Sequence, residues 1–84
     1  MLQPHKQPEN SFRIAITVAE KKPRLDAPLL EALKAQDDNL ALKNISRGAL
    51  KELFSSSKIQ IKGQRAKSSS ALAAGTTYVD ILGF

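Results

Sequence analysis

Hydrophobic and polar side chains alternate at residues 12–18, and this period of two restricts what the chain can fold into more than any other feature. A period of two with β-branched residues is typical of a half-buried β-strand. KIQIK (58–62), with Ile59 and Ile61 inward, and TTYVDIL (76–82) indicate two further strands. The face that we expect to be buried in the first strand consists of Phe12, Ile14, Ile16 and Val18.

In the middle of the chain, apolar residues recur at the spacing of an α-helix. Asp26 can accept hydrogen bonds from first-turn amides, and Pro28 is tolerated there, so we expect a helix that fades near Ala35 or Gln36. A second, short helix follows Ser46, a candidate N-cap, and ends at SSS (55–57). Residues 40–44 add an extra turn between the two helices. The apolar stripes are Leu25, Leu29, Leu30 and Leu33 in the first helix, and Leu50, Leu53 and Phe54 in the second.

The order strand, helix, helix and three short strands predicts an α+β fold, with two main helices packed on a small, mostly antiparallel sheet of short strands. A turn around Gly63 leads into a short strand, RAK (65–67), and Leu72 fills the core. We expect residues 1–11 to form a disordered tail and residues 12–84 to form one domain. The aromatic side chains that we place beside the core are Phe12, Phe54 and Tyr78.

Composition argues against several classes of function. The chain has 84 residues, no cysteine and one histidine, which lies in the expected tail. It has no phosphate-cradling glycine loop, so we expect neither an enzyme nor a metal or cofactor site. The apolar runs are too short to span a bilayer, and residues 1–11 lack the apolar region of a secretory signal. We expect a soluble, cytoplasmic monomer with no membrane partner and no small-molecule substrate.

Positive charge is concentrated in the second half of the chain. The net charge is +5, and residues 46–84 carry six basic side chains against two acidic ones, which gives +4. Such an asymmetry is common in proteins that bind polyanions, although a charge that only favours solubility gives the same count. The two acids are Glu52 and Asp80, and the basic residues are Arg47, Lys51, Lys58, Lys62, Arg65 and Lys67.

Three segments together resemble the S4 RNA-binding domain: RLDAPLLEAL (24–33), ISRGALKELFSSSKIQIKGQRAK (45–67) and AAGTTYVDI (73–81). The family pattern is RLD at the first helix, SR at the second, a hairpin containing V-x-V-N-G and a closing G-D-x-I strand. The resemblance covers roughly residues 12–82. The chain departs from the pattern at Ser57, where glycine is usual, at Lys62, where asparagine is usual, and at Thr76, where an acid is usual. The connection at residues 36–45 is also longer than in compact S4 domains.

This resemblance implies an S4-like fold and an RNA-binding protein that recognises structured RNA, either ribosomal RNA or transfer RNA, with the ribosome as a candidate site of action. It also implies that cations of the second helix and the hairpin form one basic surface for the phosphate backbone. No aromatic stacking platform is expected on it. The residues assigned to RNA binding are Arg24, Ser46, Arg47, Lys51, Lys58, Lys62, Gln64, Arg65 and Lys67.

Each assignment has an alternative. Arg24 can instead pair with Asp26 or Glu20, and Ser46 can serve only as a helix cap. The hairpin cations can simply protect sheet edges from pairing with other chains. For the whole protein, the alternatives are an interaction adapter or accessory subunit that docks on an acidic partner, and a DNA-binding protein with a helix-turn-helix-like pair.

Overall fold

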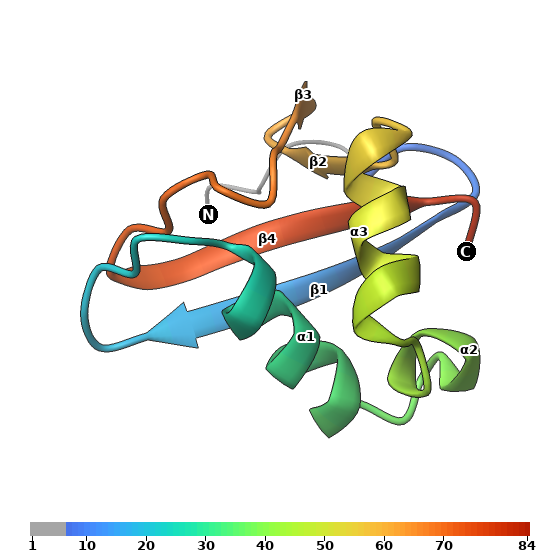
Figure 1. The fold of residues 1–84 in the computed structure, drawn as a ribbon, viewed down its shortest axis with the longest axis horizontal. Coiled ribbons are helices and arrows are strands. Elements are labelled where there is room, and N and C mark those ends of the chain that lie inside the picture. Colours follow the sequence, from blue (N-terminus) through green and yellow to red (C-terminus); the bar gives the residue numbers. More distant parts are fainter. Residues whose placement is uncertain (1–6) are drawn as a thin grey trace.

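A four-stranded antiparallel sheet forms the base of the fold (Figure 1). The computed structural model describes residues 7–84. The first and last strands of the chain pair along their full length, from Ser11 opposite Leu82 to Val18 opposite Gly75. The order across the sheet is β1-β4-β2-β3. The strands are β1 (Ser11–Val18), β2 (Ile59–Ile61), β3 (Gln64–Arg65) and β4 (Gly75–Leu82).

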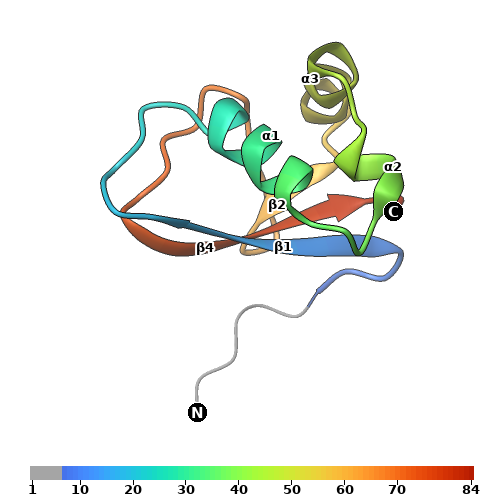
Figure 2. The same cartoon turned by 90° about the horizontal axis from the view of Figure 1, so that it is seen from below.

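The helices α1 (Asp26–Ala35), α2 (Leu40–Lys43) and α3 (Arg47–Ser55) all cover the same face of the sheet (Figure 2). The expected α+β class, with two main helices on a small antiparallel sheet, is confirmed. The extra turn expected between them is α2, where the Asn39 side chain accepts a hydrogen bond from the Leu42 amide at 3.1 Å. Within residues 7–84, no helix is both long enough and apolar enough to cross a membrane.

The hydrophobic core lies between the helices and the sheet. Strand register places Ile14 opposite Val79, so the inward residues of β1 and β4 face the helices together. The predicted plug, Leu72, is 1% exposed, and the backbone of that residue pairs with Lys22 across an isolated bridge. The side chains buried to 0% exposure are Leu25, Leu29, Leu33, Leu42, Ile59, Val79 and Ile81.

The expected disordered tail consists of residues 1–11, and residues 1–6 of it lie outside the described part of the chain. From there the chain is tied to the sheet. The Gly83 amide donates to the Asn10 carbonyl at 2.6 Å, and the Gln7 side-chain amide donates to the Ser11 carbonyl at 2.8 Å. Strand β1 begins at Ser11, one residue earlier than expected.

Tyr78 does not lie beside the core, and that expectation was wrong. The residue pairs with Ala15, which is exposed, and 42% of Tyr78 is itself exposed. Side chains alternate along a strand, so burial of Val79 and Ile81 directs Tyr78 to the face away from the helices. The Arg13 guanidinium lies 5.9 Å from the centroid of the tyrosine ring on that face. Phe54 is buried and Phe12 packs partly buried against the core, as expected.

The end of α3 explains how a helix turns directly into β2. Ser57 has a φ of 62°, the left-handed conformation that glycine usually supplies at this point. The Ser57 amide donates to the Phe54 carbonyl at 3.2 Å, and the Lys58 amide donates to the Leu53 carbonyl at 3.0 Å. These two bonds form a Schellman motif, which holds a side chain in a conformation that L-residues disfavour.

Replacing Ser57 by glycine is therefore expected to stabilise the protein by about 0.5–1 kcal/mol, because relief of the left-handed strain exceeds the added flexibility of glycine. Urea denaturation of the variant and the parent measures the difference. The matched change Ser56→Gly, where φ is −84°, is expected to destabilise. A Ser57→Gly variant no more stable than the parent would show that the corner carries no strain.

Lys62 and Gly63 form a two-residue turn between β2 and β3. Their φ angles are 53° and 75°, and the flanking residues Ile61 and Gln64 pair with each other. Two consecutive positive φ angles are typical of the type I′ turn that joins antiparallel strands. The turn expected around Gly63 is present, and the strand after it is Gln64–Arg65 rather than 65–67.

Candidate nucleic-acid interface

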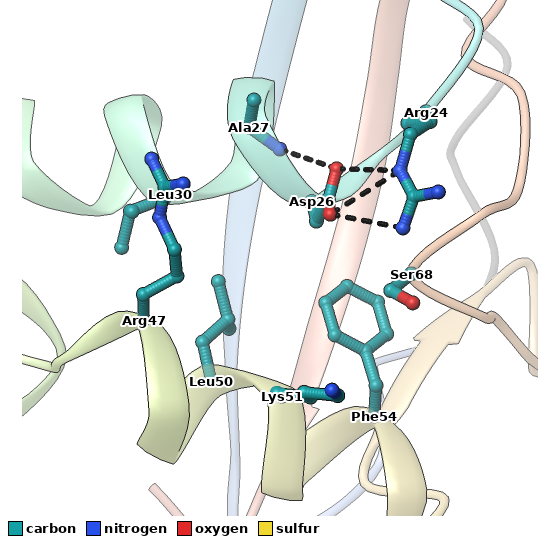
Figure 3. Close-up of a pocket in the computed structure, with 9 residues that line it drawn as sticks. All are labelled: Arg24, Asp26, Ala27, Leu30, Arg47, Leu50, Lys51, Phe54 and Ser68. Carbon is teal, nitrogen blue, oxygen red and sulfur yellow. Dashed lines mark hydrogen bonds and ion pairs between the residues drawn. The ribbon is translucent and has the colours of Figure 1, made fainter.

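A cleft of about 210 Å³ opens between the start of α1 and the length of α3 (Figure 3). Three of the cations assigned to RNA binding line it, and one carboxylate, Asp26, opposes them. The cations come from two separate segments of the chain, so tertiary packing of the helices creates the group. The lining residues are Arg24, Asp26, Ala27, Leu30, Arg47, Leu50, Lys51, Phe54 and Ser68.

Helix α3 positions two of the cations. Arg47 and Lys51 are four residues apart, so they lie on the same side of the helix, one turn from each other. Ser46 fixes where the helix begins, because the hydroxyl of this residue accepts a hydrogen bond from the Ala49 amide at 3.1 Å. Ser46 is therefore the N-cap, as expected. Leu50 and Phe54 follow at i+3 and i+7 from Arg47, next to the two cations; they are buried and hold the helix against the core.

Arg24 reaches the cleft from the segment just before α1. The Nη2 atom of this residue lies 3.2 Å from Oδ2 of Asp26, so the ion pair offered as the alternative to RNA contact is present. The arginine hydrogen bonds hold the pKa of Asp26 below its ordinary value of 3.8, against the opposing effect of partial burial. The Ala27 amide, which donates to Oδ1 at 2.9 Å, acts in the same direction. Asp26 is therefore ionised at neutral pH, and the cleft carries a net charge of +2.

The floor of the cleft is apolar. Leu30, Leu50 and Phe54 are 7%, 2% and 4% exposed, and each of them lines the cleft. Figure 3 shows the Phe54 ring between Lys51 and Ser68, and the Arg47 side chain extending from α3 toward Leu30. The segment carrying Ser68 is anchored at the end of the cleft, since the Ser68 carbonyl accepts a hydrogen bond from the Asp26 amide at 3.3 Å. A charged rim thus surrounds a hydrophobic floor.

The other assigned residues lie outside the cleft lining. Lys58, Lys62, Gln64, Arg65 and Lys67 are all exposed, on or beside the β2–β3 hairpin at one edge of the sheet. Arg65 pairs with Gln60, and Gln60 pairs with Asp80. This row faces away from the helices, because the neighbouring residue Ile59 faces the core. The structure therefore brings Arg24, Arg47 and Lys51 together around the cleft, and none of the hairpin group lines it.

A buried ion pair on the helix-free face was not anticipated. Asp80 is 1% exposed, and it accepts hydrogen bonds from Nε and Nη2 of Arg13 at 2.7 and 3.0 Å. Hydrogen bonding to Asp80 raises the pKa of Arg13, against the effect of burial. The two residues are direct partners across β1 and β4. An acid among the apolar residues of the last strand was the available sequence signal, and the strand register was needed to find its partner.

Sequence reasoning also missed the apolar floor and Ser68, because nothing local marks residues from three segments as neighbours. Within residues 7–84, no group of three or more His, Asp or Glu side chains is arranged to hold a metal ion. No protein-family model, no curated protein and no solved structure matches this chain.

Proposed function

We propose that this protein is an S4-type RNA-binding protein that recognises structured RNA, with ribosomal RNA or transfer RNA as its class of partner. The observation that carries the proposal is the gathering of Arg24, Arg47 and Lys51 around one cleft with a single opposing carboxylate. The order of elements agrees with the S4-like reading. RLD opens α1, SR opens α3, and α3 runs directly into a tight hairpin.

The cleft cations suit a polyphosphate backbone. Arg47 and Arg24 each present a planar fork of donors that can bridge two phosphate oxygens, while Lys51 supplies a mobile point charge between them. The exposed hairpin cations extend the positive field along the sheet edge, where they favour association over a wider area. Contacts of this kind depend on the shape of the RNA backbone more than on base sequence, as in the recognition of paired RNA.

Asp26 competes with phosphate for Arg24. The carboxylate pairs with the arginine in the free protein, and this pair is substantially exposed, with 57% and 38% of the two side chains accessible. An exposed pair contributes little to stability, so an incoming phosphate can displace the carboxylate at small cost. Arg24 is thereby held in a defined position before RNA arrives, which lowers the entropy cost of binding.

Alanine at both Arg47 and Lys51 is expected to weaken binding to bulk transfer RNA by roughly 10- to 100-fold, because two charge-assisted contacts are lost. Fluorescence anisotropy at one fixed salt concentration measures the change. Both side chains are exposed on α3, so the variant should keep its fold, and a denaturation curve checks this.

The matched control removes the same charge elsewhere. Lys21 and Lys22 are exposed between β1 and α1 and do not line the cleft, and the bonds from Lys22 to Leu72 involve only backbone atoms. The Lys21→Ala, Lys22→Ala variant should lose only a few-fold in affinity. Equal losses of affinity in the two variants would show that only the net charge of the protein matters. No loss of affinity in either variant would refute RNA binding at the cleft. Protein partners that stay bound in a pull-down after ribonuclease treatment would favour the adapter function.

A further inference from the structure

The cleft differs from a purely electrostatic phosphate site because its floor is hydrophobic. Phosphate contact needs only exposed cations, and Arg24, Arg47 and Lys51 already provide them at the rim. Beneath that rim, Leu30, Leu50 and Phe54 line the same space. A backbone phosphate gains nothing from contact with these three side chains, so the floor indicates a ligand that has an apolar part next to its negative charge.

The volume of the cleft limits that apolar part. Pockets for drug-sized ligands enclose about 300–1,000 Å³. The cleft holds about 210 Å³, enough for one small ring system but not for a large cofactor. Figure 3 shows Arg47 and Arg24 toward opposite ends of the cleft, with Leu50, Lys51 and Phe54 between them. An inserted ring would thus have a cation on either side to meet the phosphates of its own strand.

We propose that the cleft accepts a single unpaired nucleotide of the bound RNA, with the base against the floor formed by Leu30, Leu50 and Phe54 and the flanking phosphates on the cationic rim. This inference rests on the proposed function and specifies which feature of the RNA the protein selects. Unpaired bases in bulges and loops insert at lower cost than paired ones, because no base pair has to be broken. The protein would therefore prefer paired RNA that is interrupted by a bulge.

Two RNA hairpins test the proposal: one with a single bulged nucleotide in its stem, and the same hairpin without the bulge. The protein is expected to bind the bulged hairpin on the order of tenfold more tightly, because one base gains apolar contacts with the cleft floor. Equal affinity for the two hairpins would overturn the inference and leave the proposed function standing. Failure to bind either hairpin would contradict both.

A cleft-filling variant separates the floor from the rim. Ser68 lines the cleft with its side chain beside Phe54, so Ser68→Leu occupies the space while every cation stays in place (Figure 3). The neighbouring change Ser69→Leu is the matched control, since Ser69 is exposed and does not line the cleft. The Ser68 variant should lose the preference for the bulge, so that its affinities for the two hairpins become similar. The Ser69 variant should keep the preference.

A preference that persists in a folded Ser68→Leu protein would place the bulged nucleotide elsewhere and overturn the inference. Chemical shifts provide a readout that does not depend on any variant. The bulged hairpin should perturb the methyl groups of Leu30 and Leu50 and the ring of Phe54, and the uninterrupted hairpin should leave these signals nearly unchanged. Identical perturbations from both hairpins would likewise contradict insertion of a base.

Discussion

Replacing Arg13 by alanine is expected to lower the free energy of unfolding by about 3–5 kcal/mol, because the change leaves the Asp80 carboxylate buried without its partner. The two side chains are 17% and 2% exposed, and two hydrogen bonds join them. A domain of this size is only marginally stable, so the loss is a large share of the total. Urea denaturation monitored by circular dichroism measures it.

The second ion pair of the same type is the matched control for this prediction. Arg24 also pairs with an aspartate, Asp26, but those side chains are 57% and 38% exposed. Alanine at Arg24 should therefore cost less than about 1 kcal/mol. The apolar double change Arg13→Met with Asp80→Leu should recover most of the stability lost in Arg13→Ala, since it removes the buried charge altogether. Equal costs for Arg13→Ala and Arg24→Ala would show that Asp80 is not buried as described.

Replacing Leu42 by alanine is expected to cost about 2–5 kcal/mol, because a fully buried leucine leaves a cavity when it is truncated. Leu42 belongs to α2, a helix of four residues that cannot be stable by itself. Its 0% exposure means that this side chain anchors the connection between α1 and α3 to the core. The relative placement of those two helices, and with it the cleft, depends on that connection.

Leu40 supplies the control for Leu42 from the same helix. It is 62% exposed, so Leu40→Ala should change stability by no more than about 0.5 kcal/mol. Denaturation midpoints of the two variants give the comparison directly. If both changes cost the same small amount, then α2 does not pack on the core. A large cost for Leu40→Ala with a small cost for Leu42→Ala would indicate that α2 is rotated about its axis.

The secondary structure could be predicted from the sequence wherever the signal was local. Ser46 caps α3 because a hydroxyl at that position reaches an amide three residues on, and the sequence alone contains this spacing. The stripe of Leu25, Leu29 and Leu33 is buried because helical periodicity places the three on one side. The departure at Ser57, where glycine is usual, marked the corner at which the structure has a positive φ.

Features that depend on distant pairing were not predictable in the same way. Arg13 and Asp80 are 67 residues apart in the chain, and only the register between β1 and β4 makes them partners. Leu42 was missed because a four-residue helix has too few positions to show a period. Tyr78 was misplaced for a different reason: aromatic character was given more weight than the alternation that buries Val79 and Ile81.

In the candidate site, too, local features could be predicted and features that depend on packing could not. Charge clustering in the second half of the chain correctly singled out Arg47 and Lys51 as neighbours on one helix. It also grouped them with the hairpin cations, none of which lines the cleft. The structure instead joins Arg47 and Lys51 to Arg24, which lies before α1, and to Ser68, which follows the hairpin. Those neighbours depend on how α1 and α3 pack together.

The salt dependence of binding to transfer RNA tests RNA recognition at the cleft most directly, because its slope counts the phosphates that the protein neutralises. Each contact contributes about 0.7–0.9 to the slope of log K against log salt concentration. Alanine at Arg24, Arg47 and Lys51 together should therefore reduce the magnitude of the slope by about 2–3. An unchanged slope in the folded triple variant, or no measurable binding by the parent protein at low salt, would contradict RNA recognition at the cleft.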